Sequence, residues 1–401
     1  MGNKSIYDAS ASALGYIYQV RYALLLALKK LRDVDDPDNC VISIEKLDDI
    51  AFEDKGTPTE LLQAKYHGTP GNLSDRSSDW WKTIRIWSDM MNDPKQAFEA
   101  ATFSLITTES AASGTIASML GLDKENRDVD EAMKAMQVIA AETGNLANKA
   151  AYKAFNLLET WQQKKLLNST YVICNSPTII DVDTKIKKEL ILTVSDIHVD
   201  AFSTRLEGMW FKRAIEVMSS KIESGISLGE LRSIVDDLRT QFLPSNLPSD
   251  YDEAEPEYID IDSDDRVFVE QLRLLGVSDR VIKLAIINYY RAFEQRSRWS
   301  RDGLVMPGEL KSYMNSLEQE WEHYASLQEM DYDQSKDSEK IASGRNLYKI
   351  CQTEGAKPIR PEFKSGYVAR GTYHELSDNR KIGWHPDYSN ILQPLNDKGV
   401  A

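Results

Sequence analysis

The hydrophobic positions of the N-terminal part recur with the spacing of a helix. Over residues 10–32 the apolar side chains lie three or four positions apart, which predicts an amphipathic helix. Gln19 lies on this helix, at the end of the string Gly-Tyr-Ile-Tyr-Gln. The tyrosines of this string are expected to be half buried. Gln19 either shares their environment or points toward an acidic edge formed by the strands that follow.

The pattern changes to that of strands in the stretch VISIEKLDDIAFEDKGTPTELLQAKYH, residues 41–67. Two short strands joined by a turn are predicted here. Because strand side chains alternate between the two faces of a sheet, Gln63 and Lys65 of the second strand are expected to share one face. An acidic cluster lies near the start of the first strand and consists of Glu45, Asp48 and Asp49.

An aromatic stripe follows the two predicted strands. Its members stand at i, i+1, i+4 and i+7 of a helix over residues 75–91 and are Trp80, Trp81, Ile84 and Trp87. This spacing places them on one helix face. Burial against a sheet is the expected role of the stripe, and stacking on nucleic-acid bases is the alternative.

The order of the remaining elements indicates a mixed α/β domain. Strands are predicted at 103–108 and 169–177, and a mostly helical stretch at 111–167 separates them. Further helices follow. We therefore place a first domain at residues 1–245.

Residues 246–265 form an acidic segment that has no basic side chain between Asp250 and Asp265. This composition predicts a linker or disordered tether. The alternative is a nucleic-acid mimic that covers a basic groove. The net charge of the chain is −15, and much of it lies in this segment, so the charge of the whole chain does not exclude DNA binding elsewhere.

Helical spacing returns after this segment and predicts a mostly helical C-terminal domain over residues 266–401. Its tail is aromatic and carries His374 and His385. Neither histidine has a cysteine or carboxylate at ligand spacing, so we predict no metal site from them.

The bulk composition narrows the class of protein. The chain has 401 residues, of which 42% are hydrophobic, so it can bury sizeable cores. No apolar run has the length needed to cross a bilayer, and the N-terminus lacks an apolar signal core, so we expect a cytoplasmic protein without a membrane partner. The three cysteines, Cys40, Cys174 and Cys351, make no CxxC pair, which argues against a zinc cluster or a disulfide framework.

Candidate chemistry lies in the two predicted strands. A carboxylate, a polar oxygen and an ammonium that meet at one sheet edge can hold a divalent metal beside a phosphodiester. Asp49 precedes Gln63 and Lys65 by a distance that suits a hairpin. A surface charge pair is the alternative, but Gln63 and Lys65 lie in an otherwise apolar strand, where an unpaired charge is costly. In a strand, Glu45 and Asp49 would point to the same face, because they are an even number of residues apart, and Asp48 would point to the other face. This alternation alone leaves open which acid faces the site.

The order GYIYQ, IEKLDDIAFE, ELLQAKYH, SDWWKTIRIW and FSLITTES, over about residues 1–220, resembles the double-stranded DNA endonuclease domain of bacterial anti-phage effectors. That domain belongs to the PD-(D/E)xK superfamily, on the branch related to Mrr restriction enzymes. The resemblance implies a restriction-endonuclease-like mixed sheet flanked by helices. It also implies a Mg²⁺-dependent (or Mn²⁺-dependent) endodeoxyribonuclease acting on double-stranded DNA.

The C-terminal part, including GRNLYKI and RGTYHELSDNRKIGWHPDY, is similar to the end domain of ABC-three-component defence proteins. Together the two parts resemble the nuclease subunits of the Lamassu anti-phage and anti-plasmid system. This resemblance implies an SMC-like ATPase subunit and a small third subunit as partners, which hold the nuclease inactive. It further implies activation by release and self-association into a dimer or tetramer. We expect residues 266–401 to carry the partner contact.

When the motif positions of the family are matched to this sequence, the resemblance implies four catalytic residues, which are Glu45, Asp49, Gln63 and Lys65. Of these, Glu45, Asp49 and Gln63 would be metal ligands. Gln19 is the accessory residue. Gln63 departs from the superfamily pattern, which has Asp or Glu there, and as a neutral ligand it should lower metal affinity. This departure leaves a catalytically degenerate DNA- or protein-binding module as the main alternative. A structural adaptor and a ribonuclease also stay open.

Overall fold

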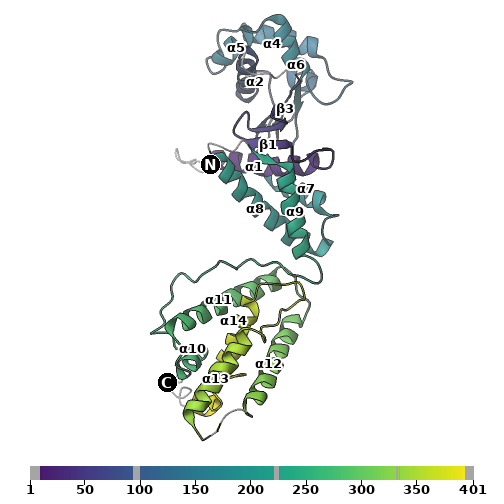
Figure 1. The fold of residues 1–401 in the computed structure, drawn as a ribbon. Coiled ribbons are helices and arrows are strands. Elements are labelled where there is room, and N and C mark those ends of the chain that lie inside the picture. Colours follow the sequence, from purple (N-terminus) through teal and green to yellow (C-terminus); the bar gives the residue numbers. More distant parts are fainter. Residues whose placement is uncertain (1–9, 94–99, 221–224, 331–332, 334, 393–401) are drawn as a thin grey trace. The chain divides into compact units, whose positions relative to one another are not determined.

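The structure is a computed structural model that describes residues 10–93, 100–220, 225–330, 333 and 335–392 (Figure 1). The chain divides into two compact units, Met1–Asp237 and Leu238–Ala401. Among the described residues, none of the helices combines the length and the apolar composition needed to span a membrane.

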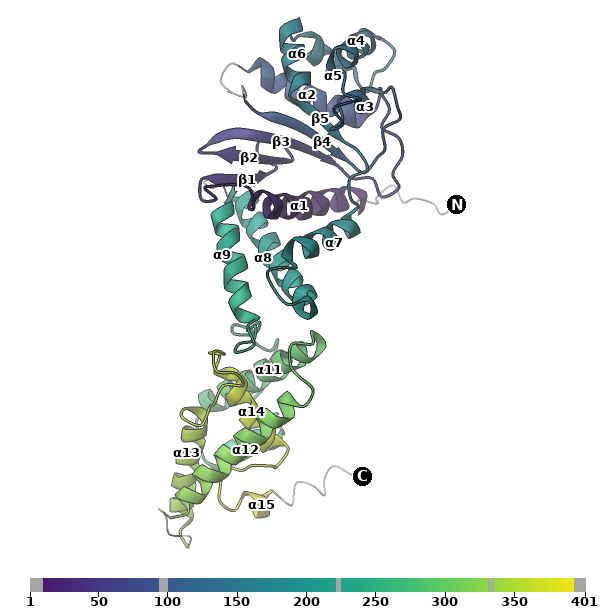
Figure 2. The same cartoon turned by 90° about the vertical axis from the view of Figure 1, so that its right-hand side faces the viewer.

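A six-stranded mixed sheet forms the centre of the first unit (Figure 2). Its strands are β1 (Cys40–Ile44), β2 (Ile50–Asp54), β3 (Thr57–Lys65), β4 (Thr102–Thr107), β5 (Thr170–Ile173) and β6 (Ile226–Ser227). They lie in the order β5-β4-β3-β2-β1-β6. The pairs on the β1 side of β3 are antiparallel, and β3–β4 and β4–β5 are parallel. Parallel neighbours need a crossover, which the helix between β3 and β4 provides.

Helices cover both faces of this sheet. They are α1 (Ser10–Lys30), α2 (Ser78–Asn92), α3 (Ile116–Met119), α4 (Val129–Ala140), α5 (Lys149–Asn156), α6 (Thr160–Asn168), α7 (Ile179–Leu190), the 3-10 helix η1 (Asp196–His198), α8 (Val199–Ser219) and α9 (Leu228–Gln241). Figure 2 shows α1, α7 and α8 on one face and α2 with α3–α6 on the other. The mixed α/β class predicted from the sequence is therefore confirmed.

The stretch 41–67 contains three strands, so the prediction of two was wrong. The acidic cluster lies in the turn between β1 and β2 instead of in a strand. A second turn at Lys55 and Gly56, both with positive φ (49° and 78°), joins β2 to β3. Positive φ at both central residues is typical of a tight hairpin turn. The Lys-Gly pair lacks the asparagine or aspartate that usually marks such a turn.

The aromatic stripe of α2 is buried, as predicted, in a core that this helix shares with the sheet and with α5, where Trp87 lies near Phe103 of β4 and Trp81 near Tyr152 of α5. Trp80, Trp81, Ile84 and Trp87 are each at most 1% exposed. The N-cap residue Ser77 accepts a hydrogen bond from the Asp79 amide, which fixes where the helix begins. Trp81 Nε1 donates to the Asp75 carbonyl over 2.8 Å, so the polar edge of this ring is also satisfied.

The second unit is helical, and its described residues include no strand. Its helices are α10 (Val267–Leu274), α11 (Asp279–Arg301), α12 (Glu309–Gln328), α13 (Asp337–Gln352), α14 (Tyr367–Asp378) and α15 (Tyr388–Ile391). The nearly buried Arg296 of α11 pairs with Glu375 of α14. The helical character predicted for the C-terminal part is thus confirmed.

Segment 246–265, predicted as a linker or disordered tether, has no helix or strand but is part of this second unit and lies against α11. Trp299 Nε1 donates to the Pro248 carbonyl (2.8 Å), and Arg291 Nε donates to the Ala254 carbonyl (2.6 Å). A free tether would make neither bond. Side-chain donors on α11 therefore order the segment despite its composition, because they satisfy backbone carbonyls that a disordered chain would leave to water.

Candidate active site

The turn between β1 and β2 presents the acidic cluster. The last strand pair is Ile44 with Ile50, and the Glu45 amide then donates to the Asp49 carbonyl over 3.1 Å. Glu45 has a φ of 57°, in the left-handed region that costs a non-glycine residue about 1 kcal/mol. The backbone conformation at Glu45 reverses the chain, so the acids are grouped at one end of the hairpin.

Asp49 is held against the end of β3 by three donors. Its Oδ2 accepts from the Ala64 amide (2.8 Å) and from Lys65 Nζ (3.1 Å), and its Oδ1 accepts from Gln63 Nε2 (2.9 Å). This placement follows from the register, because Ile50 pairs with Leu62. The structure therefore brings together Asp49, Gln63 and Lys65.

Gln63 is buried, with 3% of its surface exposed. Its Nε2 donates to Asp48 and to Asp49, and its Oε1 accepts from Lys65 Nζ over 2.6 Å. The carbonyl oxygen that the sequence predicts as a metal ligand is thus bound to the lysine. In this arrangement Gln63 positions the side chains around it, and it would have to release Lys65 before its oxygen could bind a cation.

Asp48 turns away from Lys65 and into the core, where it is 6% exposed. Its Oδ2 accepts from Trp87 Nε1 (2.8 Å), and its Oδ1 accepts from the Asp49 amide (3.1 Å). Burial raises the pKa of Asp48 to about 6, although the hydrogen bonds from Trp87 and Gln63 oppose this rise. The sequence predicted burial or base stacking for Trp87 and not this hydrogen bond, because no local signal links its indole to an acid 39 positions away.

Glu45, Asp49 and Lys65 line a cleft of about 540 Å³ together with Gln19 of α1. Burial raises the pKa of Glu45, and the charge of Asp49 raises it further, whereas Lys65 and a hydrogen bond from Gln19 lower it. The sequence left open whether Asp48 or Asp49 faces the site, and in the structure it is Asp49 that faces this cleft. The helix-borne Gln19 lies at the acidic edge, one of the two positions considered for it.

The oxygen atoms at this edge suit a hard divalent cation. Gln19 Oε1 is buried and, among the described residues, has no hydrogen-bond partner. Two carboxylates, Glu45 and Asp49, line the same cleft, and Lys65 offsets one of these negative charges. Mg²⁺ and Mn²⁺ prefer such carboxylate and amide oxygens, so the donor set present here fits either ion.

His374 and His385, from which the sequence predicts no metal site, lie in different surroundings. His374 on α14 is fully buried, with its ring near those of Phe268 and Tyr348. Burial lowers the pKa of His374 to about 3, so this imidazole is neutral at physiological pH. His385 accepts a hydrogen bond from the Asp387 amide through Nδ1 (3.1 Å). Their surroundings indicate structural roles.

The comparison with known proteins concerns the second unit. Residues 268–392 match the family model of C-terminal domain 7 of the ABC-three component systems. No curated protein matches the chain. The matched range includes most of α10 and all of α11 to α15. The match identifies this region as an ABC-three component C-terminal domain, and through that domain it supports membership of the chain in an ABC-three component system.

Proposed function

We propose that the chain is the metal-dependent DNA endonuclease of an ABC-three component defence complex, in the role of LmuA, the nuclease subunit of Lamassu systems. The observation that carries this proposal is the mutual contact of Asp49, Gln63 and Lys65 at one end of β3, where Asp49 and Lys65 line a cleft. The second unit supports the assignment to such a complex, because it matches a domain of these systems.

Glu45, Asp49 and Gln19 Oε1 would hold Mg²⁺ or Mn²⁺ in this cleft. When bound there, the cation supplies Lewis-acid polarisation of the phosphodiester and lowers the pKa of a bound water. Glu45 and Asp49 would provide the negative charge that the neutral Gln63 does not. They would thus compensate for the absence of the Asp or Glu that the superfamily has at this position.

Lys65 is the residue of the chain that meets the developing charge. Its ammonium is directed by Asp49 Oδ2 and Gln63 Oε1 and lines the cleft. A fixed cation in this position stabilises the negative charge that builds up on the phosphoryl oxygens during hydrolysis. Asp48 and Trp87 support this geometry from the core side of Gln63. Gln63 donates to one oxygen of the Asp48 carboxylate, and Trp87 Nε1 donates to the other.

The second unit would carry the contact with the partner subunits, an SMC-like ATPase and a small third subunit. These partners would hold the nuclease inactive until foreign DNA is sensed. Cleavage of both strands needs at least two active sites, so activation would involve release and self-association into a dimer or tetramer.

The direct test is plasmid cleavage in Mg²⁺ by the Lys65→Ala variant. We expect cleavage to be abolished while the far-UV spectrum and melting temperature stay as in the wild type. The matched control is Lys124→Ala, which removes an exposed lysine from a loop outside the cleft and should cleave normally. Full retention of cleavage by Lys65→Ala would refute the assignment.

A catalytically degenerate module that binds DNA or protein is the second candidate. It is favoured by one observation, the engagement of the Gln63 oxygen by Lys65. Such a module would bind plasmid DNA without cutting it at any Mg²⁺ or Mn²⁺ concentration. Offering RNA and DNA of the same sequence in the same assay separates a ribonuclease from a deoxyribonuclease.

A further inference from the structure

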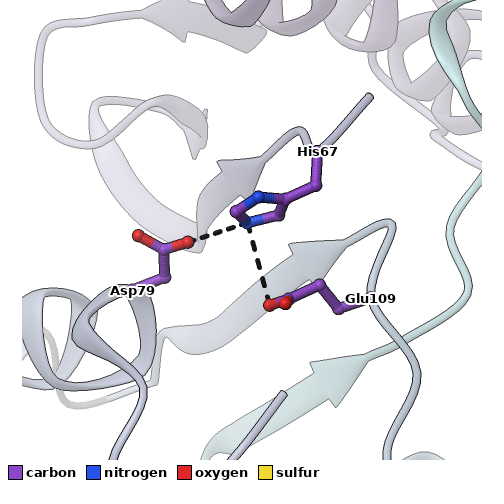
Figure 3. Close-up of side chains that lie close together, drawn as sticks. All are labelled: His67, Asp79 and Glu109. Atoms are coloured by element: carbon purple, nitrogen blue, oxygen red, sulfur yellow. Dashed lines mark hydrogen bonds and ion pairs between the residues drawn. The ribbon is translucent and has the colours of Figure 1, made fainter. Parts of the chain in front are cut away.

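Three potential metal ligands from separate elements meet beside the cleft (Figure 3). His67 follows β3, Asp79 lies in the first turn of α2 and Glu109 follows β4. One ligand atom of each lies within 4.8 Å of those of the other two. Sequence analysis did not single out these residues, because they come together only through the parallel pairing of β3 with β4 and the crossover helix.

Both carboxylates approach the same nitrogen of the imidazole. His67 Nε2 lies 2.8 Å from Asp79 Oδ2 and 3.7 Å from Glu109 Oε2. A ring nitrogen carries a single hydrogen, so it cannot make a full hydrogen bond to both acids at once. A cation placed among the three atoms would instead be bound by the nitrogen lone pair and by both carboxylates.

The backbones of two ligands are fixed independently of their side chains. Thr108 Oγ1 accepts from the His67 amide (3.0 Å) and donates to the His67 carbonyl (3.1 Å). The Glu109 amide donates to Thr107 Oγ1 over 3.2 Å. These bonds tie the end of β3 to the end of β4, so the ligands are held close together before any ion binds.

We propose that His67, Asp79 and Glu109 form a second divalent-cation site, suited to a transition metal such as Zn²⁺. One imidazole nitrogen and two carboxylate oxygens make a mixed donor set, which Zn²⁺ accepts readily, whereas Mg²⁺ prefers oxygen alone. Three protein ligands also leave a position open for water or substrate.

The site is accessible to ions from solvent. The side chains of His67, Asp79 and Glu109 are 36%, 23% and 15% exposed. His67 and Asp79 line the same cleft as Glu45 and Asp49. A cation bound by His67 would add to the positive charge of Lys65 and Lys82 in a cleft that also contains carboxylates, which favours binding of a polyanion.

The test measures metal binding and not cleavage, so it stands apart from the endonuclease proposal. Full-length protein stripped with a chelator is titrated with Zn²⁺ in a calorimeter, in the presence of excess Mg²⁺ to fill the oxygen site. We expect one Zn²⁺ binding event that His67→Gln and Glu109→Gln each weaken at least about 10-fold.

Two control variants should retain the Zn²⁺ event: His323→Gln, which removes an exposed histidine of α12, and Asp49→Asn, which alters the neighbouring acidic edge. Unchanged binding in both His67→Gln and Glu109→Gln would overturn the proposal. Loss of the event in Asp49→Asn with retention in His67→Gln would also overturn it. If a variant fails to fold, anomalous diffraction from wild-type crystals soaked in Zn²⁺ decides, since the proposal requires a peak among the three side chains.

Discussion

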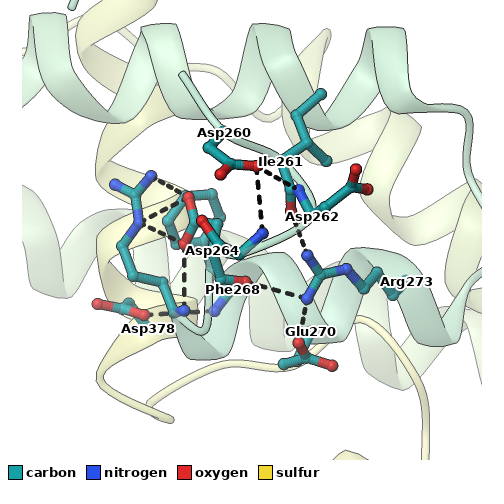
Figure 4. Close-up of polar contacts among 10 residues, drawn as sticks. Asp260, Ile261, Asp262, Asp264, Phe268, Glu270, Arg273 and Asp378 are labelled. Atoms are coloured by element: carbon teal, nitrogen blue, oxygen red, sulfur yellow. Dashed lines mark hydrogen bonds and ion pairs between the residues drawn. The ribbon is translucent and has the colours of Figure 1, made fainter. Parts of the chain in front are cut away.

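Two acidic clusters of this chain have similar compositions and very different surroundings. In the first unit, Glu45 and Asp49 line a cleft, with Lys65 as a cationic partner of Asp49. In the second unit, the acids of segment 260–264 are closely bound (Figure 4). Asp260 Oδ1 accepts from the backbone amides of Asp262 and Ser263, and the Asp264 carboxylate receives the guanidinium of Arg266.

The pKa directions express this difference. Burial raises the pKa of Asp264, but hydrogen bonds from Arg266 outweigh that effect and leave it lowered. Burial and the charge of Asp49 leave the pKa of Glu45 raised. The hydrogen bonds and the guanidinium of Arg266 thus outweigh burial at Asp264, whereas at Glu45 the donors of the chain do not. The balance of donors around an acid, and not the number of acids, identifies the candidate site.

The largest expected effect concerns the first cluster. Asp49→Asn should reduce Mg²⁺-dependent DNA cleavage at least about 100-fold, because a lost metal-ligand charge costs several kcal/mol in the transition state. Asp260→Asn is the matched control and should leave cleavage unchanged, since its acceptor bonds are to backbone amides. Plasmid cleavage rates measure both. An equal loss in the two variants would remove the distinction between the clusters.

A smaller effect is expected in the second cluster, on stability and not on activity. Arg266→Ala leaves Asp264, whose side chain is 10% exposed, without its guanidinium, and it also removes the cation over the Phe268 and Tyr289 rings. We expect a loss of about 2 kcal/mol in the free energy of unfolding, between the values of exposed and buried pairs.

Hydrogen exchange of peptides from α10 and α14 measures this loss within the second unit. The control is Arg301→Ala, which removes an exposed arginine at the end of α11 and should leave exchange unchanged. Wild-type protection in Arg266→Ala would mean that the segment is not held by this pair.

The smallest effect separates the two neighbouring acids of the turn. Asp48→Asn keeps an oxygen for Trp87 but presents an amide nitrogen to Gln63, so it should cost about 1 kcal/mol of stability. Because Asp48 faces the core, cleavage should fall by no more than about 10-fold, which is the rate equivalent of 1.4 kcal/mol. Chemical denaturation and plasmid cleavage provide the two measurements. A loss of cleavage as deep as that of Asp49→Asn would place Asp48, and not Asp49, at the centre of the site.

Sequence patterns predicted those features that depend on local periodicity. The Trp80–Trp87 stripe has helical spacing and is buried, and the change to strand composition around Gln63 and Lys65 corresponds to β3. The mixed α/β class followed from the order of such elements. Each of these features is set by which side of a helix or strand an apolar residue occupies, and that information is local.

Features that depend on register and on distant donors could not be read in this way. The third strand was missed because the left-handed conformation of Glu45 has no glycine to mark it. The difference between Asp48 and Asp49 rests on the indole of Trp87 and on the pairing of Ile50 with Leu62. The ordering of segment 246–265 rests on side chains of α11 that its own composition does not reveal.

The amide of Gln63 has a consequence for the resting state of the protein. Its nitrogen donates hydrogen bonds to the carboxylates of Asp48 and Asp49, and its oxygen accepts one from Lys65, so it bonds to all three without adding a charge. A glutamate at this position would place a third negative charge beside Asp48 and Asp49, and like-charge repulsion would open the cluster whenever divalent ions are scarce. A neutral residue here avoids that repulsion, so under the proposed metal-dependent mechanism the cluster would stay assembled without an ion and be ready to bind one.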